Sequence, residues 1–246
     1  MKIKRVLFNI KLKEDVSYKD LPEKMSQAMN KYFLASPRTM NFHENKNIKL
    51  YSYSLLEPIE KDKIYKKGRI YSFTLKYFNH FIFDELIDKI PSIQNNTFIV
   101  LNYTIENELL DLDMESIYTI VPAVFNKNKN ISDLRWTPQD NLDYIKKSII
   151  TNTIHKYNLL NKKNPIEYYD FIKNIELLSE SKIAAVFNYK GGVILANQFV
   201  IHLKDDIVSK QMGYIMLGAG VGLRNSISFG YCDYNTYDKP GCVRRG

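Results

Sequence analysis

The sequence predicts an α+β protein made of tandem ferredoxin-like domains, each with a four-stranded antiparallel sheet and helices on one face. Two observations predict this fold class. In the first half of the chain, segments with strand-like alternation and segments with helical periodicity follow one another in the order βαββαβ. In the second half, strand-like and helix-like segments recur in a looser version of that order. RNA-recognition motifs share this skeleton, which raises the expectation of RNA binding without fixing a function.

The first half of the chain supplies a complete set of elements for one such domain. Alternation predicts strands at residues 3–11, 48–56, 70–77 and 97–103. Helical spacing predicts helices at residues 21–34 and 83–90. An acidic stretch follows the last strand, and we place the domain boundary near Leu110, which divides the chain into residues 1–110 and 111–246.

The second half opens with an apolar strand at residues 117–125. The next segments are an Asn/Lys loop at 126–130, a helix from about residue 140 to 157, and strands at 171–178, 182–189 and 193–203. The sequence Tyr-Lys-Gly-Gly-Val at residues 189–193 is typical of a hairpin turn. A helix at residues 206–217 leads into a glycine-rich loop.

Composition narrows the class of protein. The 246 residues are 45% hydrophobic and 13% aromatic, enough to bury cores without disulfides. Cys232 and Cys242 have no further Cys or His partners at ligand-like spacing, so we expect neither a zinc site nor any other metal or cofactor. No apolar run approaches the ~18 residues of a membrane span, so we expect a cytoplasmic protein with no membrane partner.

The net charge of +8 is concentrated near the N-terminus, where residues 1–90 carry 18 Lys or Arg against 11 Asp or Glu. This excess favours an anionic partner through counterion release, although many basic proteins bind no nucleic acid.

The glycine-rich loop is the most distinctive motif, because four of the ten glycines lie within residues 218–230. Glycine tolerates positive φ and lets backbone N–H groups approach a ligand, which suits phosphate binding. The loop is not a Walker or Rossmann loop: no Gly-Lys-Ser/Thr occurs, and a helix precedes it where a Rossmann motif needs a strand. The residues expected to contact a phosphate backbone are Gly218, Gly220, Gly222, Arg224, Asn225, Ser226 and Ser228.

This motif resembles the C-terminal signature of the CRISPR-associated endoribonucleases that cut repeat RNA, within the repeat-associated mysterious protein (RAMP) superfamily. Their pattern is Gly-hydrophobic-Gly, about five residues, then Gly-Phe-Gly, at a spacing that suits a backbone-binding loop. Residues 220–222 and 229–230 match it, and Ser228 stands where the family usually has glycine. Residues 53–58 and 64–73 look like a strand, loop and strand in the N-terminal half of the same family.

The resemblance implies the tandem fold and a metal-independent endoribonuclease that cleaves CRISPR repeat RNA into guide RNAs. The products would carry 2′,3′-cyclic phosphate and 5′-hydroxyl ends. The partners implied are the repeat RNA, other CRISPR-associated subunits of an interference complex, and a second copy of the chain. Two alternatives remain open: a non-catalytic RNA-binding subunit of a CRISPR ribonucleoprotein, and an unrelated enzyme acting on small phosphorylated metabolites.

Cleavage of RNA without a metal needs a proton acceptor, a proton donor and a cation near the phosphorane. His43 lies in a polar segment predicted to be a loop, with Lys46 and Lys49 close behind it. The resemblance implies a catalytic His43, one of these lysines, and Tyr32 on the preceding helix. Each has a structural alternative: a surface histidine, solvated lysines, and a tyrosine packed in the apolar stripe of its helix.

The remaining histidines, His155, His202 and His80, are expected to be structural, and His80 is the reserve catalytic candidate. A basic segment between two strands of the first domain also contains Tyr65, and it is predicted either to grip an RNA backbone or to be a solvated turn. Its cations are Lys61, Lys63, Lys66, Lys67 and Arg69.

Overall fold

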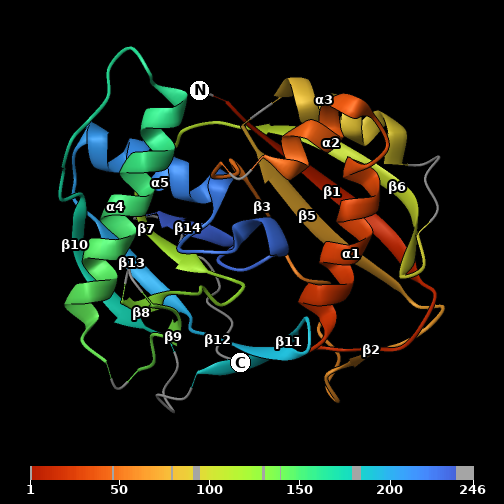
Figure 1. Ribbon diagram of the computed structural model, residues 1–246. Coiled ribbons are helices and arrows are strands. Elements are labelled where there is room, and N and C mark those ends of the chain that lie inside the picture. The colour runs from red at the N-terminus through yellow and green to blue at the C-terminus, as the bar shows by residue number, and fades with distance from the viewer. Residues whose placement is uncertain are drawn as a thin grey trace.

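The computed structural model describes residues 2–45, 47–78, 80–90, 95–128, 131–138, 140–178 and 184–236 (Figure 1). The first four-stranded antiparallel sheet has the strand order β3-β5-β1-β6. Its strands are β1 (Ile3–Leu12), β3 (Tyr51–Tyr53), β5 (Ile70–Tyr77) and β6 (Phe98–Glu108). With the helices between them, this is the βαββαβ order that the sequence predicts, in a ferredoxin-like arrangement.

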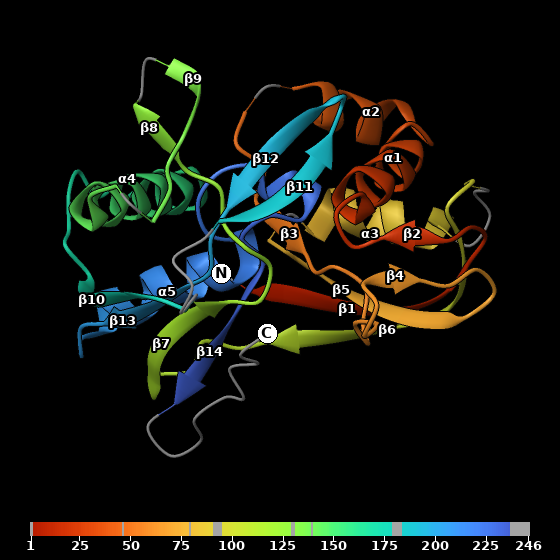
Figure 2. The ribbon, with the colours of Figure 1, turned by 90° about the horizontal axis from the view of Figure 1, so that it is seen from below.

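The helices of the first half lie on one face of this sheet (Figure 2). They are α1 (Leu21–Phe33), α2 (Pro37–Glu44) and α3 (His80–Lys89). In α1, the apolar residues at helical spacing are buried against the sheet, as the sequence predicts. Helix α2 was not expected, because the sequence analysis treats residues 41–49 as a loop.

The second four-stranded antiparallel sheet has the order β10-β13-β7-β14, which repeats the order of the first. Its strands are β7 (Met114–Thr119), β10 (Ile172–Leu177), β13 (Phe199–Leu203) and β14 (Cys232–Thr236). The helices α4 (Leu142–Leu160) and α5 (Ile207–Ala219) complete a second βαββαβ unit. The prediction of a tandem ferredoxin-like fold is therefore confirmed.

Among the described residues, three two-stranded pairs lie outside these sheets. They are β2 (Val16–Ser17) with β4 (Ile64–Tyr65), β8 (Asn126–Asn128) with β9 (Ile131–Arg135), and β11 (Ala185–Tyr189) with β12 (Gly192–Ala196). The predicted turn between β11 and β12 is confirmed, since Lys190 and Gly191 have φ values of 50° and 75°. Two other predictions are wrong: the segment 126–130 contributes strand β8, and the long strand 193–203 is interrupted at residues 197–198, where the backbone of Asn197 turns to pair with Ala123.

The two halves share their cores. Phe187 and Phe229, both from the second half, pack in the core beneath α1, with their rings 5.2 Å apart. The β11–β12 hairpin is fastened to the N-terminal end of α1, where the Asn188 amide nitrogen donates to the Lys19 carbonyl at 3.0 Å and the Lys190 amide donates to Glu23 at 2.8 Å. Segments far apart in the sequence therefore lie side by side at this end of α1 (Figure 2).

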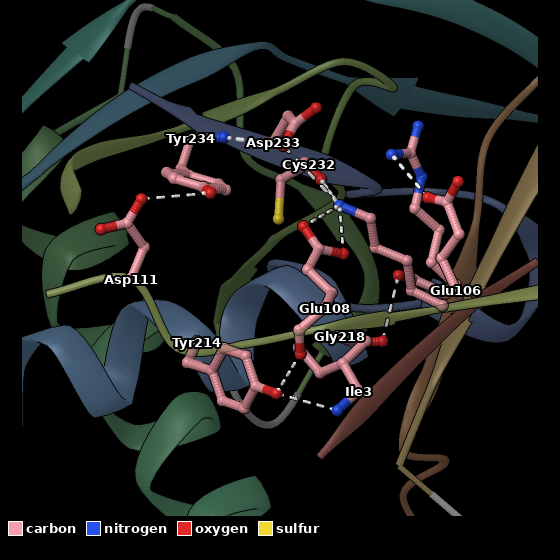
Figure 3. Close-up of polar contacts among 12 residues, drawn as sticks. Ile3, Glu106, Glu108, Asp111, Tyr214, Gly218, Cys232, Asp233 and Tyr234 are labelled. Carbon is pink, nitrogen blue, oxygen red and sulfur yellow. Dashed lines mark hydrogen bonds and ion pairs between the residues drawn. The ribbon is translucent and has the colours of Figure 1, made fainter. Parts of the chain in front are cut away.

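A polar cluster also joins the two sheets (Figure 3). Tyr214 on α5 accepts a hydrogen bond from the Ile3 amide at 2.9 Å and donates to the Glu108 carbonyl at 2.5 Å. The buried Lys76 on β5 pairs with Glu108 at 3.4 Å and with Asp233 on β14 at 3.7 Å. Burial acts to lower the pKa of Lys76, but these neighbours raise it above its usual value, so the lysine stays charged and holds β5 and β14 together.

No helix in the described ranges is long and apolar enough to cross a membrane.

Candidate functional site

The glycine-rich loop runs from the end of α5 to β14, as the sequence predicts, and its glycines are required by its shape. Gly220, Gly222 and Gly230 have φ values of 77°, 72° and 71°. A Cβ at Gly222 would lie 2.8 Å from the Val124 carbonyl oxygen, and one at Gly230 would overlap the Val221 carbonyl. Only glycine fits these positions without rearrangement of the loop.

Ser228, at the position where the RAMP pattern has glycine, also adopts a left-handed conformation, with φ of 81°. Its side chain is fully buried, and its hydroxyl donates a hydrogen bond to the Tyr53 carbonyl at 3.0 Å. This bond ties the loop to β3 and offsets the conformational cost of a side chain at positive φ.

Gly218 is not part of the loop. It lies in the last turn of α5, where a Cβ would come within 2.5 Å of Phe78 and 2.9 Å of Ile3. Its lack of a side chain therefore serves the close packing of α5 on the first half of the chain. The loop begins at Gly220, two residues later than the sequence analysis places it.

Asn225 holds the loop closed from inside. Its side-chain amide donates to the Val221 and Phe229 carbonyls at 2.9 and 2.8 Å. Its Oδ1 accepts a hydrogen bond from Lys156 of α4 at 2.8 Å. The Asn225 side chain, predicted to contact RNA, is thus used within the protein.

Lys156 is a component of the site that the sequence analysis missed. Only 1% of the residue is exposed, and its Nζ donates to the carbonyls of Ala219 at 3.2 Å and Gly220 at 2.7 Å, besides Asn225. It caps the C-terminal end of α5, where backbone carbonyls are unpaired and the helix dipole favours a cation. Burial lowers the pKa of Lys156 to about 7.

A pocket of about 320 Å³ opens beside this loop. It brings together three segments: the connection after α2, one face of α4, and the glycine-rich loop. Its basic side chains are Lys49, Lys156 and Arg224, and no carboxylate of the described residues lines it. The full lining is Asn45, Asn47, Ile48, Lys49, Asn152, Lys156, Gly222, Leu223, Arg224, Asn225 and Ser226. We call it the basic pocket.

Lys49 is fixed in this pocket by the end of α2. Its Nζ donates to the Asn45 carbonyl at 2.6 Å and also to the Phe42 carbonyl, and it lies 4.5 Å from the centre of the Phe42 ring. Two of the three ammonium N–H groups are used in this way, so one remains for a ligand. Burial lowers the pKa of Lys49 from its usual value.

His43 lies in the last turn of α2, two residues before Asn45, which lines the basic pocket. It is half-buried, and its ring stacks on Phe33 with centroids 5.2 Å apart. Burial and the nearby Lys49 ammonium lower the pKa of His43, against a smaller opposing effect of Glu44. The expectation that His43 lies in a loop is wrong, but its position near Lys49 is as expected. Lys46 lies outside the described residues.

Tyr32 is buried in the first core, as its structural alternative predicts. Its hydroxyl accepts a hydrogen bond from Asn95 at 2.6 Å, and burial raises its pKa above the usual value. Tyr32 does not line the basic pocket. The tyrosine that links this region to the glycine-rich loop is Tyr51, whose hydroxyl is hydrogen-bonded to Ser226.

The basic segment at residues 61–69 contributes nothing to the basic pocket. Tyr65, the aromatic residue of this segment, is fully buried and donates to the Leu56 carbonyl at 2.9 Å. Lys66 pairs with Asp62 at 2.5 Å and Arg69 pairs with Glu60 at 2.8 Å. Lys63 lies 5.4 Å from the ring centre of Tyr18. Contact with RNA stays a prediction for the five basic residues Lys61, Lys63, Lys66, Lys67 and Arg69.

The other histidines differ in position. On β13, the Nε2 of His202 lies 3.1 Å from the Oε1 of Glu176, and His202 does not line the basic pocket. His80 begins α3. His155 was expected to be structural, but it is exposed on α4 and lines a second pocket of about 280 Å³ beside the first. Within the ranges that the structure describes, no group of three or more His, Cys, Asp or Glu side chains could hold a metal ion.

The fold is shared with solved structures of CRISPR proteins. A Cas6-related protein of Pyrococcus furiosus matches with a TM-score of 0.70 at 16% identity, over 95% of this chain and 98% of that one. A RAMP protein binding different RNA substrates matches with a TM-score of 0.71 at 14% identity, over 94% and 99% of the two chains. A Cas6 product complex matches with a TM-score of 0.60 at 10% identity, over 96% and 100%. The chain therefore has the Cas6 and RAMP fold.

No family model matches the sequence, and no curated protein matches it.

Proposed function

We propose that the protein binds CRISPR repeat RNA and cleaves it without a metal, leaving 2′,3′-cyclic phosphate and 5′-hydroxyl ends. The observation that carries the proposal is the basic pocket. It is lined by Lys49 from the connection after α2 and by Arg224 from the glycine-rich loop of a Cas6-like fold, with His43 beside it. Polyanion binding suits a pocket with these two cations and no carboxylate among its described lining residues.

Phosphate would enter between Lys49 and Arg224. Arg224 takes a left-handed conformation at the turn of the loop, with φ of 61°, and its guanidinium lies 5.8 Å from the Tyr189 ring centre. Its planar fork can bind phosphate oxygens in pairs while stacked on an aromatic ring. Lys156, with all its N–H groups used on the loop, supports the loop without contacting the RNA.

His43 supplies the proton transfer. The 2′-oxygen attacks the adjacent phosphorus, and its proton passes to the imidazole of His43. The bond from phosphorus to the 5′-oxygen then breaks as that oxygen takes up a proton. A lowered pKa keeps the imidazole of His43 neutral at pH 7, which suits the role of general base, and its protonated form can then act as the acid. The remaining N–H of Lys49 is available to stabilise the charge on the phosphorane.

The domain boundary near Leu110 is part of the proposal. Strand β6 ends at Glu108 and β7 begins at Met114, so residues 109–113 connect the two sheets. We propose that RNA lies across the connected halves, since the basic pocket takes its lining from both of them.

Cleavage of labelled repeat RNA by the wild-type protein in excess EDTA tests the proposal. We expect cutting at one position, a cyclic phosphate on the upstream fragment, and no cutting when the nucleotide before that position is 2′-deoxy. Cutting that needs added metal, or that survives the 2′-deoxy substitution, would contradict the mechanism. Tight binding without cutting would identify a non-catalytic RNA-binding subunit instead.

A further inference from the structure

The second pocket shares a wall with the basic pocket. Asn152, Gly222 and Leu223 line both, so the two pockets lie next to each other over α4 and the glycine-rich loop. The second pocket continues along α4 past Tyr144, Thr151 and His155. It has a volume of about 280 Å³, close to the lower end of the about 300–1,000 Å³ found for small-molecule sites.

The chemistry of the two pockets differs. The second pocket has no Lys, Arg, Asp or Glu among its described lining residues. It offers instead aromatic and aliphatic surface from Tyr144 and Leu223, with hydroxyl, amide and imidazole groups from Ser148, Asn152 and His155. Such a combination of a flat apolar surface and hydrogen-bonding groups, without Lys or Arg, suits a nucleobase better than a phosphate.

Asn152 provides an independent sign of a missing ligand. It lies at the shared wall, and its Oδ1 is buried without a hydrogen-bond partner among the described residues. An unpaired amide oxygen inside a protein costs free energy, and its partner would have to be a donor. The exocyclic amino group of a base is such a donor.

We propose that the second pocket binds the base of a nucleotide next to the phosphate held in the basic pocket. This inference rests on the proposed function, and adds a position at which the protein reads the base. Tyr144 stacks on the base, and rotation of the Asn152 amide toward the pocket lets its buried oxygen accept a hydrogen bond from the edge of the base. Because Asn152 lines both pockets, one strand can place a phosphate on one side of it and a base on the other.

The test is a scan of uncleavable repeat RNAs, each with the 2′-deoxy block and one abasic position, for affinity to the wild type and to Tyr144→Ala. For the wild type, we expect one abasic position near the cut to weaken binding by about 5- to 100-fold. Tyr144→Ala should weaken binding of the full RNA similarly and make that abasic position neutral. Tyr168→Ala, at a tyrosine that is 66% exposed and lines neither pocket, is the matched control and should behave as the wild type.

A second variant covers the case in which Tyr144→Ala fails to fold. Thr151 is exposed at the pocket, so Thr151→Trp fills the space from outside and should abolish sensitivity to the same abasic position. Binding and cutting of the unmodified repeat RNA are measured in parallel. If a folded variant still binds and cuts this RNA but keeps the abasic profile of the wild type, the base pocket is refuted and the proposed function stands. If the wild type binds no RNA, both are refuted.

Discussion

Lys156 Nζ lies 2.7 Å from the carbonyl oxygen of Gly220, and this contact joins the C-terminal part of α4 to the first residue of the glycine-rich loop. The same nitrogen reaches Ala219 and Asn225. Asn225 in turn binds the Val221 and Phe229 carbonyls, so one buried lysine organises the loop from its beginning to its end.

Replacing this lysine should destabilise the protein. Lys156→Met removes the donor to three buried oxygens, and we expect the free energy of unfolding to fall by about 2–4 kcal/mol. Urea denaturation measures the change. Lys147→Met, at an exposed lysine on the same helix, is the matched control and should lie within about 0.5 kcal/mol of the wild type. Equal stabilities of the two variants would show that the contacts contribute nothing.

Two substitutions of Ser228 distinguish the free-energy cost of its left-handed conformation from the contribution of its hydrogen bond. Ser228→Ala keeps a side chain at φ of 81° and loses the bond to Tyr53, so the free energy of unfolding should fall by about 1 kcal/mol. Ser228→Gly loses the same bond but relieves the left-handed conformation, and should remain near the wild type. Thermal or urea unfolding compares the three proteins. A glycine variant less stable than the alanine variant would contradict this account of the loop.

The pKa of His43 should depend on Lys49. Burial and the Lys49 ammonium both lower this pKa, so Lys49→Met should raise the pKa of His43 toward the usual histidine value of about 6.5. The sign follows from charge: removing a neighbouring cation makes protonation of the imidazole easier. NMR titration of the His43 ring measures the midpoint, with Lys147→Met as the control. A midpoint that falls, or that moves equally in both variants, would contradict the placement of Lys49 beside His43.

Arg224 and Arg69 were both expected to contact RNA, and the structure distinguishes them. Arg224 lines the basic pocket, whereas Arg69 pairs with Glu60 and does not. Arg224→Gln should weaken RNA binding and reduce the magnitude of its salt dependence by about one phosphate contact, while Arg69→Gln should change neither. Affinities measured over a series of salt concentrations decide between them. A larger loss for Arg69→Gln would move the RNA path to the segment 61–69.

Much of the fold could be predicted because local patterns carry it. Alternation and helical spacing gave β5 with its observed ends and α1 to within one residue. Helix α2 was missed although its start signal is present: the Ser36 hydroxyl accepts the Thr39 amide at 3.2 Å and Pro37 is the first helical residue. The polar residues of this helix have no long apolar stripe, so periodicity alone could not detect it.

The site was harder to predict, because its parts are brought together by tertiary contacts. The glycine motif, and His43 with Lys46 and Lys49 close behind it, could be selected as candidates from residue types and spacing. The role of Lys156 could not, since its partners lie more than 60 positions later in the chain. A lysine within the buried side of α4, near Ile149 and Thr153, was the one available signal.

Single-turnover cleavage of repeat RNA by His43→Ala and His202→Ala tests the catalytic role of His43. His202 is a second histidine with a described partner outside both pockets, so it controls for the loss of an imidazole. We expect His43→Ala to slow cleavage by about 100- to 10,000-fold with little change in RNA affinity, and His202→Ala to cut as the wild type does. Undiminished cleavage by His43→Ala would contradict the catalytic assignment and leave His80 as the next residue to replace.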